Sequence, residues 1–455
     1  MKKIRIPMML VSWVMCYAVF ASSAHERVAP FVMPPSSDGK DAFFGGFDFE
    51  APSVLAFDAG NRPYMFDSRR VETFGRILTL RRGKWVRLSF LEALRKTWPE
   101  VGPTHIPWKD WGLGTMAFDK DNALYALIPA EIKKGQPRWI LVFSPDQGRS
   151  FQAHLIPGYP CLEIPTRRGP LEYPPAIGTC RGKSKKAAAW TNYNDFMVYV
   201  PSKKGKRRLV LGEPIKVTEN NFGMSNHSGG YSFAASVGER VHFVYAEVAP
   251  DKKGNPTYAA TIDRRHRKLI ARKFLVKASP SGPDIHATPV ICADSKGYLH
   301  VLSGAHGQSF FYLRSEKPDS VEDGWSEPVP AGTGQTYATL CADASGRLHS
   351  VFRTHPVLRY VNKAPDAEKW SRPMDLARAP GGHRGYTVWH QRLFIDAADA
   401  LYLSFTYMGN DQLKDPYPRA LIVSEDGGST WKPASTETFM KRMAAWPGRR
   451  RSEST

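Results

Sequence analysis

Short runs of β-branched and aromatic residues recur along this chain, and each run ends at a polar turn that leads directly into a second run. Such pairs of runs are typical of β-hairpins, whereas the periodicity of an amphipathic helix is scarce here. The two clearest copies are TPVICADSKGYLHVLSGAH, which starts at Thr288, and ATLCADASGRLHSVFRTH, which starts at Ala338. Asp294 and Asp343 open the turns of these two copies. The pattern therefore predicts a fold built from repeated hairpins.

Five looser copies bring the series to seven, near residues 57–64, 118–125, 190–200, 236–242 and 395–402. Repeats of about 50 residues with several short strands each indicate a β-propeller, because a single blade cannot bury its own faces and the blades close into a ring. The predicted fold class is all-β, a seven-bladed β-propeller. The stretches 157–186 and 203–226 are rich in Pro, Gly and Lys and are expected to be insertions within blades.

Two segments, SEDGGSTW at residues 424–431 and SPDQGRSF at residues 144–151, match the Asp-box pattern Ser-x-Asp-x-Gly-x-Thr-Trp. This pattern resembles the turn between the outer strands of sialidase-type propellers. Its Asp is expected to cap the turn, and its aromatic residue is expected to pack between blades. The motif therefore supports the architecture and does not identify an activity.

The chain start is predicted to be a secretory signal peptide, residues 1–24, because Lys2, Lys3 and Arg5 precede a short apolar run and then small residues. That run is shorter than a membrane span of about 20 residues. We therefore expect a secreted or periplasmic protein that does not insert into a membrane. Residues 25–440 are expected to form a single propeller, and residues 441–455 a basic, disordered tail.

Composition narrows the partners that such a protein would meet. The formal charge of +20 favours polyanions, and export favours an acidic polysaccharide over nucleic acid. The cysteine spacings fit no metal motif, so no metal or other cofactor is expected. Cys161 and Cys180 can form a disulfide or remain free, whereas Cys292 and Cys341 are expected to be buried strand residues. We expect the protein to act as a monomer.

Hairpin geometry predicts where the candidate chemistry lies. The start of the first strand and the end of the second share one edge of a hairpin, opposite the turn. His286 and His306 flank one clear copy symmetrically, and Tyr337 and Arg353 flank the next. These four residues are predicted to meet on one face of two neighbouring blades. By contrast, three histidines that follow the turns are expected to be structural: His242, His300 and His349.

Further polar and aromatic residues fall at the same edge of the other repeats and are predicted to bind substrate: His227, Tyr231, His355, Tyr386 and His390. Cleavage of a uronate chain by β-elimination needs a group that neutralises the carboxylate, a base and an acid. A guanidinium can bind a carboxylate through two parallel hydrogen bonds. His and Tyr can transfer the protons. The predicted cluster contains all of these residue types.

The segments DIHATP from Asp284, GYLHV from Gly297, GAH from Gly304, Thr336-Tyr337 and Phe352-Arg353 together resemble BNR-repeat propellers that include the ulvan lyases. The resemblance implies that Tyr337 acts as base and acid and that Arg353 neutralises the carboxylate. It also implies that His286 and His306 position the substrate or transfer protons. The expected function is a polysaccharide lyase that cleaves an acidic, ulvan-like chain.

Two alternatives remain open from the sequence. A glycoside hydrolase, rhamnosidase-like or sialidase-like, would need carboxylates at this edge, where Glu247 and Asp284 are the obvious ones. A propeller without catalytic activity would bind an acidic glycan through its basic surface alone.

Overall fold

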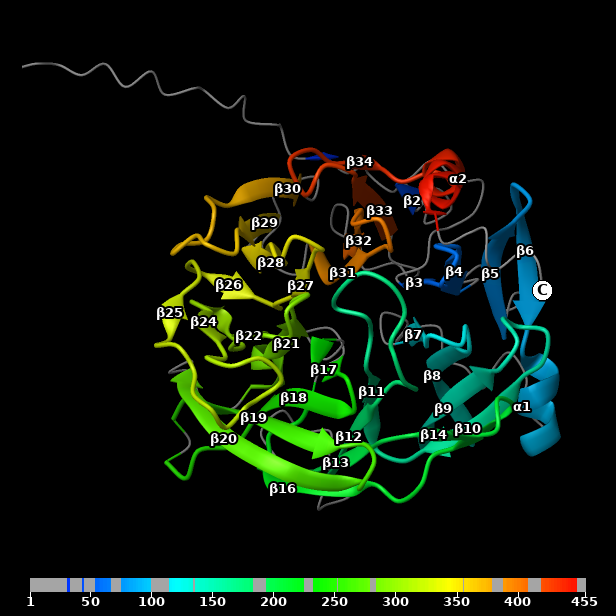
Figure 1. Ribbon diagram of the computed structural model, residues 1–455, viewed down its shortest axis with the longest axis horizontal. Helices are drawn as coiled ribbons and strands as arrows, with labels where there is room; N and C mark the ends of the chain where they lie inside the picture. The colour runs from blue at the N-terminus through cyan, green and yellow to red at the C-terminus, as the bar shows by residue number, and fades with distance from the viewer. Residues whose placement is uncertain are drawn as a thin grey trace, which may run out of the picture.

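The computed structural model confirms a seven-bladed β-propeller, with the blades arranged around a central axis (Figure 1). The structure describes residues 31–32, 43–44, 54–66, 75–99, 114–133, 136–182, 194–224, 232–251, 253–278, 284–354, 356–378, 388–407 and 419–447. No helix among these residues is both long and apolar enough to span a bilayer.

Most blades are antiparallel sheets of four strands that follow one another in sequence. Blade 1 contains β3 (Leu55–Phe57), β4 (Pro63–Phe66), β5 (Arg76–Arg81) and β6 (Lys84–Ser89). Blade 2 contains β7 (Thr115–Phe118), β8 (Leu124–Lys133), β9 (Gln136–Ser144) and β10 (Gln152–Ile156), and helix α1 (Leu91–Thr97) precedes it. Blade 3 contains β11 (Tyr159–Leu162), β12 (Ile177–Gly182), β13 (Asn194–Tyr199) and β16 (Ile215–Asn221). A separate hairpin, β14 (Ser202–Lys204) with β15 (Arg208–Val210), branches from blade 3.

The remaining blades carry the candidate site. Blade 4 contains β17 (Ala234–Val237), β18 (Arg240–Ala246), β19 (Asn255–Asp263) and β20 (Lys268–Ala278). Blade 5 contains β21 (Val290–Ala293), β22 (Leu299–Leu302), β24 (Phe311–Arg314) and β25 (Val329–Pro330). Blade 6 contains β26 (Gln335–Thr336), β27 (Cys341–Ala342), β28 (Leu348–Thr354), β29 (Val357–Lys363) and β30 (Met374–Arg378), and β23 (His306–Gln308) joins it from blade 5. Blade 7 contains β31 (Val388–Ile395), β32 (Leu401–Tyr407), β33 (Arg419–Ser424) and β34 (Lys432–Pro433). Two early strands, β1 (Phe31–Val32) and β2 (Phe43–Phe44), add in parallel to β30 and β33.

The inner hairpins turn as the repeats predict. The Oδ1 atom of Asp294 accepts hydrogen bonds from the backbone amides of Lys296 and Tyr298, both at 2.9 Å. Gly297 takes a positive φ of 85° in this turn, a conformation that most side chains disfavour. Asp343 caps the equivalent turn of blade 6 in the same way. The repeated Asp is therefore a turn residue.

Both predicted Asp-boxes form the turn between the two outer strands of a blade. The carboxylate of Asp426 accepts hydrogen bonds from the amide and the hydroxyl of Thr430. Trp431 packs against Tyr360 of blade 6, with ring centroids 5.6 Å apart. In blade 2, Asp146 binds Ser150 in the same pattern. The motif closes a turn and joins neighbouring blades, as predicted.

Blade 3 corrects the sequence prediction. Residues 190–200 were expected to hold its first hairpin, but Asn194–Tyr199 is the third strand, β13, and the hairpin consists of β11 and β12. Those two strands fall within the stretch 157–186 that was expected to be an insertion. The pattern was obscured because residues 163–176 replace the short polar turn with a long loop.

This loop crosses the centre of the ring on the turn side. The carbonyl of Thr166 accepts a hydrogen bond from the Ala342 amide of blade 6, and the Leu171 amide donates to Phe118 of blade 2. Glu163 is fully buried and binds Arg264 and Ser236 of blade 4. The loop therefore links blades that are not neighbours in the ring.

Side chains close the ring between the first and last blades. The amide of Asn61, in the turn of blade 1, donates to Asp396 of blade 7, and its Oδ1 accepts from the Ala397 amide. Helix α2 (Thr436–Ala445) packs over this junction, where Arg442 binds Asp396. Trp446 donates to the Ala59 carbonyl. The domain boundary expected at residue 440 falls inside this helix.

The cysteines and the turn histidines are buried within blades. None of the four described cysteines forms a disulfide, although Cys161 and Cys180 lie on adjacent strands, and Cys292 and Cys341 lie on inner strands as expected. His300 bonds to Tyr312 and lies beside Asp294, and His349 bonds to Tyr360 and Asp343. His242 bonds to Thr261 and Asp319. These histidines belong to the blade interior, away from the edge that carries the site.

Candidate functional site

The four residues predicted to meet do lie together. His286 precedes β21 in a short 3-10 turn, His306 begins β23, Tyr337 follows β26, and Arg353 lies on β28. The ring centroids of His286 and His306 are 4.9 Å apart, and that of Tyr337 is 5.5 Å from His286 and 6.5 Å from His306. Strand pairing brings them into register, since Thr336 pairs with both His306 and Arg353. The four residues therefore lie close together, as hairpin geometry predicts, and their roles stay predictions.

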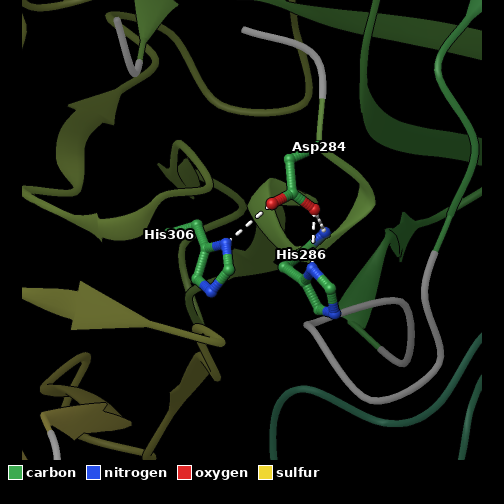
Figure 2. Close-up of side chains that lie close together, drawn as sticks. All are labelled: Asp284, His286 and His306. Atoms are coloured by element: carbon green, nitrogen blue, oxygen red, sulfur yellow. Dashed lines mark hydrogen bonds and ion pairs between the residues drawn. The ribbon is translucent and has the colours of Figure 1, made fainter. Parts of the chain in front are cut away.

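The carboxylate of Asp284, a candidate for the hydrolase alternative, bonds to both histidines. Nδ1 of His286 lies 2.6 Å from Oδ1 of Asp284, and Nδ1 of His306 lies 2.6 Å from Oδ2 of the same side chain (Figure 2). The backbone amide of His286 also donates to Oδ1, at 2.9 Å. Asp284 is the N-cap of the 3-10 turn that carries His286. One residue therefore starts the turn and orients both imidazoles.

These hydrogen bonds decide how the histidines are protonated. Burial raises the pKa of Asp284, but the hydrogen bonds from His286 and His306 outweigh it and hold the pKa well below its usual range. The carboxylate is thus ionised at neutral pH and can only accept hydrogen bonds. Both Nδ1 atoms must then carry protons. Each ring then has its Nε2 atom left for another partner.

Tyr337 and Arg353 form the second half of the site. Both side chains are buried, each with 1 % of its surface exposed, and the guanidinium carbon lies 4.4 Å from the centre of the Tyr337 ring. A guanidinium over an aromatic face is attracted by the ring and stabilises negative charge on it. The side chain of His306 is more open, at 35 % exposed. The site thus combines a partly exposed imidazole with a buried tyrosine and a buried arginine.

A close backbone approach keeps the two histidine segments together. A Cβ atom on Gly304 would lie 1.7 Å from the carbonyl oxygen of Ala287, so only glycine fits between the segments that carry His286 and His306. The GAH segment around this residue carries part of the family resemblance, and only its histidine was predicted to be a site residue. The missed signal was a glycine two residues before a candidate site residue.

The predicted substrate-binding residues are mostly untested by the structure. His227, Tyr231, His355 and Tyr386 lie outside the described residues. His390 is described on β31, where it is partly exposed and takes a φ of 51°. The next residue, Gln391, donates to the carbonyl of Tyr337, so this segment of blade 7 adjoins the site.

The two carboxylates considered for hydrolysis have different partners. Asp284 is held by two imidazoles, as described above. Glu247 binds Arg272 at 2.8 Å and accepts a hydrogen bond from Thr218. Both carboxylates are therefore engaged by other side chains.

The same cluster is also the place where a metal ion could bind. Asp284, His286 and His306 each offer one ligand atom, and these atoms lie within 4.8 Å of one another. Two imidazoles and one carboxylate suit a divalent transition metal. A metal at the Nδ1 atoms would have to displace both hydrogen bonds to Asp284. The prediction that no metal is needed can thus be tested at this trio.

Comparison with known proteins agrees with the fold. Residues 231–445 match the model of the BNR repeat-containing family, a span that begins just before blade 4 and ends with helix α2. The match covers somewhat less than half of the chain, and it agrees with the repeated blades of the propeller. No curated protein matches the chain.

Solved structures of proteins with several activities are similar to this chain at low identity. An ulvan lyase is 11 % identical with a TM-score of 0.46, covering 89 % of this chain and 99 % of that one. In a second ulvan lyase structure, bound to GlcA(1-4)Rha3S, the match covers 49 % of this chain and only 60 % of the other, with 13 % identity and a TM-score of 0.36. An α-L-arabinanase from Penicillium chrysogenum is 11 % identical with a TM-score of 0.42, covering 68 % of this chain and 92 % of that one. These similarities concern the fold alone.

Proposed function

We propose that the protein is a polysaccharide lyase that cleaves a uronate-containing acidic polysaccharide by β-elimination. The observation that carries the proposal is the pair of imidazoles held by Asp284 beside Tyr337 and Arg353. Elimination requires proton removal next to a carboxylate and proton delivery to the leaving oxygen, and these side chains can supply both. The basic surface would attract an anionic chain.

In the proposed reaction, the Tyr337 oxygen removes the proton from the carbon next to the uronate carboxylate. A carbon-carbon double bond forms as the glycosidic carbon-oxygen bond breaks, and the leaving oxygen takes a proton from Tyr337. His286 accepts the phenol proton that must leave before the first step. The guanidinium of Arg353 stabilises the negative charge that develops on the ring.

The substrate carboxylate requires a separate partner. The resemblance to ulvan lyases implied Arg353, but its guanidinium stacks on the Tyr337 ring, 4.4 Å from the ring centre. We assign the carboxylate to His306, the more exposed imidazole, which can donate from Nε2 when protonated while Asp284 holds Nδ1. Arg353 then stabilises the negative charge on the Tyr337 ring and does not bind the substrate carboxylate.

The experiment is incubation of the purified protein with ulvan, glucuronate-rich gums, glycosaminoglycans and pectins. The ultraviolet absorbance of an unsaturated uronate is followed together with the formation of new reducing ends. A rise in both signals on one polysaccharide supports elimination and names the substrate class. New reducing ends without the absorbance would indicate hydrolysis. Binding without either signal would indicate a glycan-binding propeller.

A further inference from the structure

The backbone of Tyr337 has a conformation that a tyrosine does not adopt readily. Its φ of 62° lies in the left-handed region, where the Cβ atom crowds the backbone. The residue interrupts the inner strand of blade 6, since β26 ends at Thr336 and β27 begins at Cys341. An unfavourable conformation of this kind persists only where the surrounding contacts hold it.

Blade 7 supplies such a contact. The pairing of β31 with β32 shifts register between Trp389 and Arg392, and His390 in this bulge has a φ of 51°. The buried side chain of Gln391 donates from Nε2 to the carbonyl oxygen of Tyr337, at 2.7 Å. Bulges next to active sites commonly redirect a side chain. Here the redirected side chain reaches across the boundary between two blades.

The bulge is itself anchored at a second point. Arg392 is buried, and its Nη1 donates to the carbonyl of Gly114, just before the first strand of blade 2, at 2.6 Å. Two consecutive side chains of blade 7 therefore bind backbone carbonyls of two different blades. Gln391 is thus held at a defined place relative to Tyr337.

We propose that Gln391 is a positioning residue that fixes the Tyr337 peptide in its left-handed conformation and thereby sets the ring over Arg353 and beside His286. This inference rests on the proposed function, since it concerns the geometry of the proposed base. In a regular strand, successive side chains point to opposite faces, so relaxation of residue 337 would turn the ring away from its partners. A catalytic group displaced by about 1 Å can lose 10²-fold in rate.

The first test measures kcat and KM of Gln391→Leu, which removes the donor at similar volume, and of Gln391→Glu, which places an acceptor against the carbonyl. We expect kcat to fall about 10²-fold in both variants while KM stays within about threefold. The control is Thr179→Val on blade 3, which removes a partly buried hydrogen bond from the Thr179 hydroxyl to the Pro157 carbonyl. Unchanged kcat in both Gln391 variants, or an equal loss in the control, would overturn the proposal.

The second test does not need turnover. Crystal structures of the wild type and of whichever Gln391 variant crystallises are compared at residue 337. We expect φ to leave the left-handed region in the variant and the ring to move off Arg353. An unchanged backbone and ring would refute the positioning role even in an active enzyme. If the wild type turned over no uronate polysaccharide, the proposed function would be refuted. The role of Gln391 would still be decided by this comparison of structures.

Discussion

The hydrogen bonds of a single carboxylate organise the candidate site. Asp284 accepts from the amide and Nδ1 of His286 on one oxygen and from Nδ1 of His306 on the other. Because the ionised carboxylate has no proton to give, it fixes the same tautomer in both rings. The chemistry of two histidines on different strands thus depends on one side chain.

Asp284→Asn is expected to lower kcat by roughly 10²- to 10⁴-fold with little change in fold. The amide keeps the size of the carboxylate, but its NH2 group would face a ring nitrogen that already carries a proton. One imidazole must then change tautomer or turn away. Steady-state kinetics on the substrate found in the panel measures the effect.

The control for this variant is Asp294→Asn in the same blade. Asp294 also lies beside a histidine, His300, but at the turn edge. We expect it to lower thermal stability and leave kcat close to the wild-type value. Equal kinetic losses in the two variants would contradict the assigned role of Asp284.

Arg353→Lys separates two possible roles of the arginine. If the guanidinium stabilises charge on Tyr337, as its stacking on the ring indicates, kcat should fall at least about tenfold while KM changes little. If it bound the substrate carboxylate directly, KM should rise instead. A variant with raised KM and unchanged kcat would therefore speak against the proposed arrangement.

The sequence could predict His286, His306, Tyr337 and Arg353 together because their proximity follows from backbone pairing alone. The roles of Asp284 and Gln391 could not be predicted in the same way. They depend on side-chain rotamers and on the left-handed backbone of Tyr337. Neither feature has a periodic signal in the sequence.

At the scale of elements, the junction between blades 1 and 7 has no shared sheet. Strands of the two blades are not paired in the described part of the chain, and Asn61, Asp396 and helix α2 make the contact instead. Asn61 has a φ of 57°, which asparagine tolerates better than most residues. The side-chain hydrogen bonds of Asn61 and its backbone conformation thus both stabilise the junction between blades 1 and 7.

Asn61→Ala is expected to destabilise the protein by roughly 2–4 kcal/mol, because it removes two buried hydrogen bonds and leaves a strained backbone. Asn61→Gly loses the same hydrogen bonds without the strain, so it should be less destabilising. Chemical denaturation measures the free energy of unfolding of both variants. Equal stability of the alanine variant and the wild type would contradict this account of ring closure.

The elements were predictable where the hairpin turn is short and polar. The repeats at Asp294 and Asp343 gave strands β21, β22, β27 and β28 nearly as observed. Blade 3 was not predictable in this way, because its hairpin encloses the loop at residues 163–176. The contacts of that loop with blades 2, 4 and 6 are distant in sequence and leave no local pattern.

For the whole molecule, buried histidines should set the response of stability to acid. Burial lowers the pKa of His242 and of His300 from 6.5, although Asp319 and Asp294 oppose the shift. The unfolded chain therefore takes up protons before the folded protein does. The contribution of these histidines is complete above pH 6.5 and is lost as the pH falls below it.

Between the pKa of each histidine in the unfolded chain and its pKa in the folded protein, we expect the free energy of unfolding to fall by about 1.4 kcal/mol per unit of decreasing pH. His242→Gln should flatten the loss of thermal stability on acidification, whereas His266→Gln, at an exposed position, should not. Melting temperatures between neutral and mildly acidic pH provide the comparison. If the melting temperature of His242→Gln fell with pH as steeply as that of the wild type, His242 would not be responsible for the loss of stability in acid.

The central claim is that Tyr337 carries the proton transfers of an elimination. The most direct measurement is the rate of unsaturated product formation by Tyr337→Phe on the substrate identified for the wild type. Tyr360→Phe, a buried tyrosine of the same blade at the turn edge, is the matched control. We expect a loss of about 10³-fold or more in Tyr337→Phe, with substrate affinity within a few-fold and the control still active. Full turnover by Tyr337→Phe would contradict the claim.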